Sequence, residues 1–503
     1  MTTTTTDTQY PAFAAQHAYE PVIGLEVHAQ LLTVSKMFCA CSTAYADAPP
    51  NTRVCPVCLG MPGVLPLING EAVRKTVMTA LALHCEIPEF SKFDRKNYPY
   101  PDLVKGYQIS QYDMPLSRTG YLDIKVGGRA KRIGITRVHL EEDTAKLLHR
   151  SEGGQQYSLM DVNRAGVPLM EIVSEPEINS PEEARAYFMA LRGVLQYLGV
   201  NNGDMEKGSL RCDVNISLRP AGSSELPTYK AEIKNVNSFR AVMGALEFEI
   251  ERQRRALSAG EALIQETRGW SEDLGQTVPQ RTKEFAHDYR YFPEPDLPPL
   301  LMERAVVESI RAALPELADA RTTRLAQRYG LPEATAEQLT SAKELADYFE
   351  EAVGLAPGDD GRAVANWIVG DLQYLLHTSG QELGACQVTP RHLGGMLELL
   401  ANGTLSTKLA KQVFERMFAT GKDAATVVRE EGLVQVSNAD ELEAVIRAAM
   451  EGNPQAVSDY RAGKTTAFQF LVGKVMAATK GKADPNLTRQ ILQRILEVGD
   501  VGG

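Results

Sequence analysis

The segment SLRCDVNISLR, residues 209–219, alternates apolar and polar side chains along its whole length. A period of two sends neighbouring side chains to opposite faces of an extended backbone, so this segment predicts a β-strand. One face is apolar, and we expect a hydrophobic core behind it. The other face carries charged and amide side chains, namely Arg211, Asp213, Asn215 and Arg219.

Further segments of the first half repeat this pattern. They are residues 24–31, 132–143, 161–173 and 229–234. Pro168 interrupts the third of them. A strand face that only meets water normally carries scattered Thr, Ser and Lys, whereas these faces carry carboxylates and histidine. We therefore predict a sheet that lines a cradle, with ordinary surface polarity as the alternative.

The same segments gather acidic residues and one histidine in a single region. Hard cations such as Mg²⁺ prefer carboxylate oxygens and tolerate a histidine. Each residue alone is more often a surface charge than a ligand, but the set favours a metal–phosphate site of the kind that ATP chemistry uses. The set is Glu26, His28, Glu141, Glu142, Asp143, Asp161, Glu171, Asp213 and Glu232.

The sharpest local motif is a group of four cysteines with the spacing Cys-x-Cys-x13-Cys-x2-Cys. Two close thiol pairs joined by a loop supply the four soft ligands of a tetrahedral zinc ion. Redox-active thiols are the main alternative. Because four protein ligands leave no open position, we predict structural zinc, held by Cys39, Cys41, Cys55 and Cys58.

The charge of the chain limits the classes of partner. The 503 residues carry a net charge of −11, which excludes a simple polycationic nucleic-acid binder. Residues 92–150 nevertheless hold 12 Lys and Arg against 7 Asp and Glu, and residues 460–494 hold 7 against 1. Such segments could meet phosphates, and a solvated surface is an equally good explanation.

Two motifs invite a phosphate-binding interpretation. Residues 92–111 mix cations, aromatic rings and prolines, which suits a phosphate grip or a channel lining as well as an ordinary surface loop. The triplet Gly463-Lys464-Thr465 resembles the end of a P-loop, but Ser458 stands where the motif requires its first glycine and no strand precedes it. We therefore exclude a P-loop.

The composition of the N-terminal segment, the longest uncharged stretch and the cysteine count favour a cytoplasmic location. Residues 1–18 are rich in Thr and lack the basic start and apolar core of a secretory signal. The longest uncharged stretch, residues 54–70, is broken by prolines and glycines and cannot span a membrane. Seven cysteines, an odd number, argue against a disulfide framework. We expect a cytoplasmic protein without a membrane partner.

The texture of the chain changes at the proline-rich residues 289–299. Short alternating segments precede them and helical periodicities follow. We predict an α+β fold: a mixed α/β cradle domain with an antiparallel sheet, then an all-helical domain and a small helical tail domain. The boundaries are 1–18 for a disordered N-terminal extension, 19–297 for the cradle domain with the zinc site, 298–432 for the helical domain and 433–503 for the tail.

Several long stretches resemble one family, that of the B subunit of aspartyl/glutamyl-tRNA(Asn/Gln) amidotransferase. The resemblance extends from about Tyr19 to the end of the chain. It is carried by VIGLEVHAQL (22–31), SKFDRKNYPYPD (91–102), RIGITRVHLEEDTAK (132–146), DVNRAGVPLMEIVSEP (161–176), GSLRCDVNISLRP (208–220) and DYRYFPEPDLPPL (288–300).

This resemblance implies a glutamine-hydrolysing carbon–nitrogen ligase that works as a heterotrimer. An amidase-type glutaminase subunit would release ammonia, a small third subunit would link the complex, and a channel would bring the ammonia to this chain. Here ATP would phosphorylate the side-chain carboxylate of glutamyl-tRNA(Gln) or aspartyl-tRNA(Asn), and ammonia would displace the phosphate. The basic tail would bind the tRNA.

The resemblance also implies roles for individual residues. Magnesium would be held by Glu26, His28, Glu142 and Glu171, and zinc by the four cysteines as in the zinc-bearing members. Lys96 and Lys105 match positions that resemble the gate of the ammonia channel. The implied catalytic set is Glu142, Asp213, Glu232, Lys96 and Lys105. From the strand pattern we add Arg211 and Asn215 as phosphate or substrate contacts.

Two other functions fit parts of the sequence. A small-molecule carboxylate–ammonia ligase would use the same acyl-phosphate chemistry, but it would not need a tRNA-binding tail. A non-catalytic, zinc-containing RNA-binding scaffold would need neither ATP nor ammonia. The carboxylate-lined strands argue against the scaffold, because carboxylates repel phosphates unless a metal ion lies between them.

Overall fold

The computed structural model describes residues 18–282, 289–433, 439–479 and 482–498. The predicted extension 1–18 therefore lies outside the described residues, apart from Ala18. The chain divides into two compact units, Met1–Leu317 and Ala318–Gly503. This division falls later than the expected boundary at residue 297, because helix α5 (Arg304–Ala312) buries Val307 and Ile310 in the core of the first unit.

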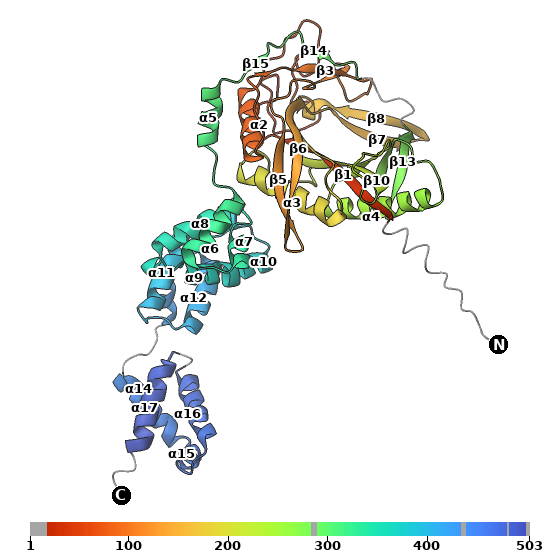
Figure 1. The fold of residues 1–503 in the computed structure, drawn as a ribbon. Coiled ribbons are helices and arrows are strands. Elements are labelled where there is room, and N and C mark those ends of the chain that lie inside the picture. The colour runs from red at the N-terminus through yellow and green to blue at the C-terminus, as the bar shows by residue number, and fades with distance from the viewer. Residues whose placement is uncertain (1–17, 283–288, 434–438, 480–481, 499–503) are drawn as a thin grey trace, which may run out of the picture. The chain divides into compact units, whose positions relative to one another are not determined.

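The first unit is built on an eight-stranded sheet with the order β13-β12-β11-β10-β1-β9-β6-β5 (Figure 1). Neighbouring strands are antiparallel except for β11 and β12, which are parallel. The strands are β1 (Tyr19–Gln30), β5 (Gly120–Val126), β6 (Arg129–Glu142), β9 (Pro168–Ser174), β10 (Leu210–Pro220), β11 (Ala231–Val236), β12 (Glu266–Ser271) and β13 (Gln276–Thr282).

Four of the predicted strands are confirmed as β1, β6, β10 and β11. The prediction of one interrupted strand over 161–173 is wrong. Asp161 ends strand β8 (Gln155–Asp161), which pairs with β7 (Lys146–Glu152) in a separate hairpin. The Asp161 carboxylate then caps a 3₁₀ turn at Val162–Arg164, and β9 starts at Pro168, the first strand position, where a missing N–H is tolerated.

Helices cover the apolar face of the sheet. They are α2 (Gly70–Ala82), α3 (Pro181–Tyr197) and α4 (Phe239–Ser258), and Figure 1 shows α3 and α4 along one side of the strands. The start of α3 is fixed locally, because the Ser180 side chain accepts a hydrogen bond from the Glu183 N–H and Pro181 follows it. The apolar side chains of β1 and β10, such as Leu25 and Val214, are completely buried in this core.

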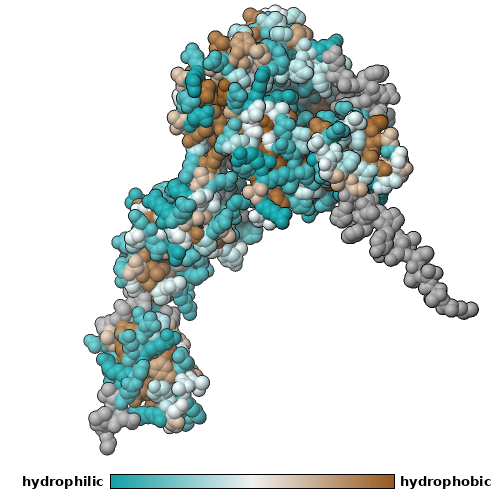
Figure 2. All heavy atoms as spheres, in the orientation of Figure 1, coloured by the Kyte–Doolittle hydropathy of each residue, from teal (hydrophilic) through white to brown (hydrophobic). Residues whose placement is uncertain are grey.

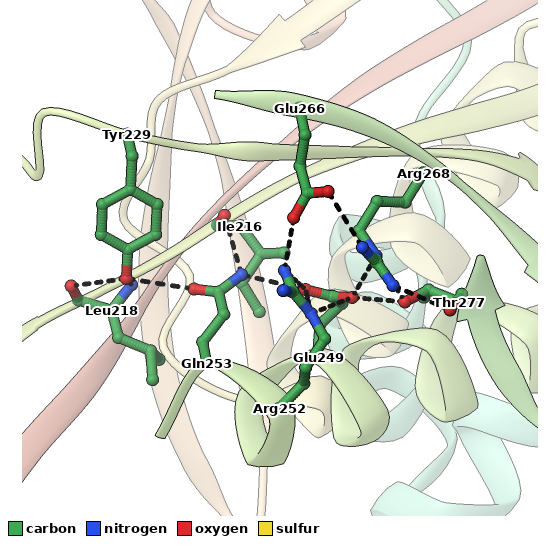
Figure 3. A network of polar contacts seen from close by, with 9 residues as sticks. All are labelled: Ile216, Leu218, Tyr229, Glu249, Arg252, Gln253, Glu266, Arg268 and Thr277. Atoms are coloured by element: carbon green, nitrogen blue, oxygen red, sulfur yellow. Dashed lines mark hydrogen bonds and ion pairs between the residues drawn. The ribbon is translucent and has the colours of Figure 1, made fainter. Parts of the chain in front are cut away.

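A buried ion network fixes the edge of the sheet to α4 (Figure 3). The Glu249 carboxylate is fully buried and accepts hydrogen bonds from Arg252, and it lies 2.9 Å from Arg268 Nε. Glu266 on β12 bridges the same two guanidinium groups at 2.8 and 2.9 Å. Each of these buried charges therefore has opposite charges in hydrogen-bonding range, as burial requires.

Short strands form a second layer on the side of the large sheet away from α3 and α4 (Figure 1). A three-stranded sheet contains β14 (Phe292–Pro293), β3 (Asp94–Asn97) and β4 (Tyr107–Ser110) in that order. Strand β15 (Leu300–Leu301) pairs with β2 (Phe90–Ser91). The predicted loop around residues 92–111 is thus partly strand, and it packs over the polar face of the sheet at β6.

The second unit is helical, as predicted. Its buried side chains form one cluster from Leu325 to Val428 and another from Leu442 to Leu496. Hydrophilic side chains lie between smaller hydrophobic areas on the face shown in Figure 2, as expected for helices that turn one apolar stripe inward. The helices are α6 (Ala318–Tyr329), α7 (Glu333–Leu339), α8 (Lys343–Leu355), α9 (Gly361–Asn366), α10 (Gln373–Ser379), α11 (Pro390–Ala401), α12 (Thr407–Thr420), α13 (Ala424–Glu431), α14 (Ala439–Glu451), α15 (Pro454–Arg461), α16 (Thr465–Ala478) and α17 (Pro485–Val498).

Within the described ranges, none of the helices combines the length and the apolarity needed to cross a membrane.

Candidate active site

Strand register assembles a row of titratable side chains across the polar face of the sheet. His28 on β1 lies opposite Glu171 on β9 on one side and Arg211 on β10 on the other. Glu171 in turn lies opposite His139 on β6. Because directly opposed residues of antiparallel strands point to the same face, these four side chains share one surface.

Three of the side chains on this face form a compact cluster. Ligand atoms of His28, Glu141 and Glu171 all lie within 4.8 Å of one another. His28 Nε2 is 3.5 Å from a Glu171 oxygen and 3.9 Å from a Glu141 oxygen. Two carboxylates and one imidazole are a donor set that suits a hard divalent cation. Among the described residues His28 Nδ1 has no hydrogen-bond partner, so Nε2 is the nitrogen that faces the carboxylates.

Burial and mutual charge set the protonation of this cluster. Burial raises the pKa of Glu141, and the negative charge of Glu171 raises it further. Burial opposes ionisation of Glu171 as well, but His139, His28 and Lys96 together hold its pKa well below the usual range. Burial likewise opposes protonation of His28, yet the hydrogen bond and charge of Glu171 raise its pKa. The site thus keeps one carboxylate ionised and holds positive charge around it.

His139 completes the cluster, and it adds positive charge beside Glu171 only in acid, where its imidazole is protonated. Its Nε2 is 3.5 Å from a Glu171 oxygen, and the side chain is buried. Burial lowers the pKa of His139 to about 4, and the positive charges of Arg137 and Lys96 act in the same direction. A neutral imidazole at this position can orient the Glu171 carboxylate without competing with it for a cation.

Lys96 reaches this cluster from the second layer. Its ammonium lies 5.1 Å from the centre of the Tyr289 ring and 5.9 Å from that of Tyr98. Burial opposes protonation of Lys96, but the negative charges nearby, that of Glu141 first, raise its pKa. Lys96 therefore stays cationic beside the cluster of His28, Glu141 and Glu171.

Glu142 does not join the cluster, although its neighbour Glu141 does. Successive residues of a strand point to opposite faces, so Glu142 points away from the row that contains His139. Its carboxylate lies 2.5 Å from Lys105 Nζ and accepts a hydrogen bond from the Ile109 N–H at 3.0 Å. The predicted pair Glu142 and Lys105 is thus brought together, but at a site separate from His28 and Glu171.

The remaining predicted residues extend the polar face away from the cluster. The Asn215 amide donates to Glu26 at 2.8 Å, and Glu26 lies opposite Asp213 in the strand register. Lys234 forms ion pairs with Asp213 at 3.0 Å and with Glu232 at 2.8 Å. A cavity of about 350 Å³ continues beyond Glu26, lined by Gly24, Asn215 and the segment 226–230.

Arg211 faces the opposite end of the row. Its guanidinium lies 3.0 Å from Asp143, whose carboxylate is completely buried. The other Asp143 oxygen accepts a hydrogen bond from the Gln30 amide at 2.7 Å. Burial disfavours the Asp143 carboxylate, but Arg211 and Arg164 outweigh that effect and lower its pKa. Arg211 is therefore held in a fixed orientation beside His28.

The four predicted cysteines come together as expected. Their sulfur atoms all lie within 4.8 Å of one another, so the group could hold a metal ion such as zinc. The turn that joins the second pair is tight, since the Cys55 N–H donates to Cys58 Sγ at 3.1 Å. A hydrogen bond from Cys39 lowers the pKa of Cys58 to about 4. A thiolate that forms so easily is the ligand form that metal binding needs.

Sequence reasoning missed two contributors to the site. His139 was not singled out, although it stands two residues before Glu141 and alternation places both on one face. Lys234 was seen on its strand but was given no role, and the structure shows it between two of the predicted carboxylates. In both cases the local pattern held the signal, but the choice of face depended on the register of neighbouring strands.

Comparison with known protein families places this fold. Residues 21–308 match the GatB/GatE catalytic domain, and residues 347–496 match the GatB domain. The carboxylate-lined sheet and the helical unit thus define a GatB-type protein.

The B subunit of aspartyl/glutamyl-tRNA(Asn/Gln) amidotransferase from Dehalococcoides mccartyi is 54% identical over 490 residues, which cover 96% of this chain and 99% of that protein. The protein of the same name from Moorella thermoacetica is 55% identical over 478 residues, covering 95% and 100%. The chain belongs to this family of aspartyl/glutamyl-tRNA(Asn/Gln) amidotransferase B subunits, which confirms the resemblance seen in the sequence.

Proposed function

We propose that this chain is the subunit that activates and amidates the aminoacyl-tRNA. In the first step a side-chain carboxylate oxygen of glutamyl-tRNA(Gln) or aspartyl-tRNA(Asn) attacks the γ-phosphorus of ATP, and ADP leaves. In the second step ammonia attacks the carbon of the acyl phosphate, loses a proton, and inorganic phosphate leaves. Activation is necessary because a free carboxylate is a poor acyl donor.

The cluster of His28, Glu141 and Glu171 is the observation that carries this proposal. It lies on the polar face of the cradle, where the donor set suits Mg²⁺. A magnesium ion, when bound, would neutralise charge on the phosphoryl group during its transfer. Glu171 is held ionised by the groups around it, and His139 fixes its orientation from behind. The structure thus favours Glu141, rather than Glu142, beside the predicted ligands His28 and Glu171, with Glu26 further along β1.

Cations around the cluster suit an anionic substrate. Lys96 stands beside Glu141 and Glu171, and Arg211 is oriented by Asp143, which follows the end of β6. We assign to these two side chains the contacts to phosphate oxygens, since a preorganised cation stabilises charge that develops in the transition state. Asn215 lines the 350 Å³ cavity beside Glu26, where it has room to contact the substrate.

Asp213 and Glu232 share the cation Lys234, and we assign them to the same substrate pocket. Their carboxylates hold Lys234 between them at 3.0 and 2.8 Å. Burial opposes protonation of Lys234, but Asp213 and Glu232 raise its pKa, so this group stays charged as well.

The pair of Lys105 and Glu142 is assigned to ammonia entry. It lines a cavity of about 200 Å³ beside Cys58, on a different side of β6 from the metal-ligand cluster. Ammonia would come from glutamine hydrolysed by an amidase-type glutaminase subunit, and a small third subunit would complete the heterotrimer. The passage beside this ion pair can open only if Lys105 or Glu142 moves, so the pair can control when ammonia enters.

The other parts of the chain complete the assignment. The helices between Leu442 and Leu496 carry the basic segment 460–494, which we assign to tRNA binding. The four-cysteine group would hold structural zinc, because all four positions of a tetrahedral ion are filled by protein. We place the reaction in the cytoplasm, where charged tRNAs are used.

The test uses the chain purified in complex with its two presumed partner subunits. The complex receives glutamyl-tRNA(Gln), glutamine and γ-labelled ATP, and labelled phosphate and the amino acid on the tRNA are followed together. We expect glutamine on the tRNA with wild type, and neither phosphate nor amide with Glu171→Gln. Glu142→Gln should keep tRNA-dependent ATP cleavage but lose amide formation from glutamine.

Other outcomes point elsewhere. ATP cleavage that persists in Glu171→Gln would show that the metal-ligand assignment is wrong. Equal activity on free glutamate, unchanged after removal of residues 433–503, would replace the tRNA substrate by a small carboxylate. A complex that makes no amide on either tRNA would refute the proposed reaction.

A further inference from the structure

Lys36 is a buried cation that the proposed reaction does not use. Only 1% of the residue is exposed, and its ammonium has no hydrogen-bond partner among the described residues. Its backbone N–H donates to the Cys41 carbonyl at 2.9 Å, and its own carbonyl accepts from the Asn69 amide. These bonds hold the backbone of Lys36 beside the loop that carries the cysteines, residues 39–58, and the side chain of Lys36 stays buried away from water.

The side chain of Lys36 runs alongside the metal ligand Cys58. Gly166 serves as a reference point, because a methyl group built on it would lie 3.5 Å from Lys36 Cδ, 3.6 Å from Cys58 Cβ and 3.9 Å from a Glu142 carboxylate oxygen. Lys36 and Cys58 therefore pack around the same glycine.

The other cation near the cysteines is already engaged. Among the residues that line the cavity beside Cys39 and Cys58, Lys105 carries the positive charge, and it is paired with Glu142 at 2.5 Å. Lys36 has no such carboxylate in hydrogen-bonding range. The Glu142 carboxylate beside Gly166 is already paired with Lys105, so the charge of Lys36 is left to the thiolates.

A charge balance follows from this arrangement. Four thiolates and one Zn²⁺ carry a net charge of −2, which is costly in a partly buried site. An unpaired buried ammonium is costly as well. The two costs offset one another when the ion is bound, whereas in the metal-free chain the ammonium lacks that compensation.

We propose that Lys36 is the counter-charge of the metal-loaded four-cysteine site and strengthens its binding of zinc. This role rests on the zinc assignment made above and is independent of the amidation reaction. The role predicts different effects on two properties. Removing the charge of Lys36 should weaken zinc binding, but it should not destabilise the metal-free chain.

The test compares Lys36→Met, which keeps the length of the side chain without the charge, with wild type. Zinc affinity is measured on the full chain under reducing conditions by competition with a coloured chelator. The unfolding temperature is measured with and without zinc. We expect the zinc dissociation constant to rise about tenfold or more, and the unfolding temperature of the metal-free variant to equal or exceed that of metal-free wild type.

Two further variants isolate the charge. Lys36→Arg keeps the charge and should bind zinc more tightly than Lys36→Met. Lys75→Met removes a lysine of α2 that bonds the Gly199 carbonyl, away from the cysteines, and should leave zinc affinity unchanged.

Every outcome decides the matter. If Lys36→Met binds zinc as tightly as wild type, if the Arg and Met variants lose affinity equally, or if the metal-free Met variant fails to fold, Lys36 acts by packing and the proposal is overturned. Wild type that takes up no zinc would refute the zinc assignment itself. The loss of the Lys36 role and the loss of the zinc site are thus separate results.

Discussion

The four-cysteine group and the cluster of His28, Glu141 and Glu171 are built in opposite ways. Both bring potential metal ligands within 4.8 Å. The cysteines come from one loop between residues 39 and 58, so their spacing along the chain already describes the site. The other cluster comes from β1, β6 and β9, and only strand register brings its members together. Spacing along the chain reveals a site whose ligands come from one loop. A site whose ligands come from several strands is revealed only by the pairing of those strands.

The two sites also differ in what surrounds the ligands. The cysteines offer four soft donors that would enclose an ion on all sides. The strand cluster offers three donors and lies beside Lys96 and Arg211. We therefore expect one site to act on stability and the other on the reaction, and four experiments test that division.

The largest expected effect is on the strand cluster. Glu171→Gln removes the carboxylate that His28 and His139 share, so amide formation should fall on the order of 1,000-fold. Zinc content and unfolding temperature should stay near those of wild type. The assay is amidation of glutamyl-tRNA(Gln) by the complex, with Glu20→Gln at the outer end of β1 as control. A variant that lost zinc along with activity would erase the distinction between the two sites.

The matching change at the other site is Cys58→Ser. We expect the chain to lose its bound zinc, and with it about 4 kcal/mol of stability when zinc is present at 1,000 times its Kd. Activity per folded molecule should be largely retained. Metal analysis and urea unfolding measure the first two quantities. Cys386→Ser in the second unit is the control and should keep its zinc. Activity that fell as far as in Glu171→Gln would mean that the cysteine site takes part in the reaction.

The buried ion network around Glu249 on α4 tests the same division from another side. It is charged like the polar face of the cradle, but its charges are paired with one another and buried. Glu249→Gln leaves Arg252 and Arg268 with one carboxylate fewer and should cost about 3 kcal/mol at pH 7. Burial opposes ionisation of Glu249, but Arg252 and Thr277 outweigh it and lower its pKa. A carboxylate whose pKa is lower in the folded state than in the unfolded state stabilises the fold. This contribution is complete above the unfolded pKa of about 4.3, and it disappears as the pH falls through the folded-state pKa.

The difference between wild type and Glu249→Gln should therefore narrow below about pH 4. Urea unfolding at several pH values measures it. Glu251→Gln, which removes an exposed helical ion pair with Arg255, is the matched control and should cost less than about 1 kcal/mol. A difference that stayed constant down to pH 3 would assign the effect to packing instead of charge.

The smallest effect separates the two adjacent glutamates of β6. Glu141→Gln should weaken binding of Mn²⁺, used as a spectroscopic probe for Mg²⁺, by about 10- to 100-fold. Glu142→Gln should change it less than about twofold, because Glu142 faces Lys105 on the other side of the strand. Electron paramagnetic resonance of free Mn²⁺ measures both. The reverse order would restore Glu142 as a ligand.

The sequence predicted the parts of the fold whose signal is local. Alternation identified β1 and β10, and helical periodicity identified the second unit. Strands β12 and β13, at one end of the sheet, were not predicted because their apolar residues do not alternate cleanly. The parallel pairing of β11 with β12 is a tertiary relation for which a single strand carries no mark.

The candidate site was predictable to the same degree. The cysteine spacing indicated its site directly. The strand pattern indicated that Glu26 and His28 share a face, and the register agrees. The choice between Glu141 and Glu142 was beyond the pattern, since period two separates them but does not say which one lies on the face of Glu171.

The central place of β1 in the sheet has a consequence for biosynthesis. Strand β1 is made first, yet its partners β9 and β10 follow only at residues 168 and 210. At about 5–20 residues per second, the ribosome leaves at least one edge of this strand unpaired for roughly 10–40 s. During that time β1 is an open template for other chains. Nascent chains of this protein should therefore depend on chaperones until β10 has emerged, and fragments that end before residue 210 should aggregate.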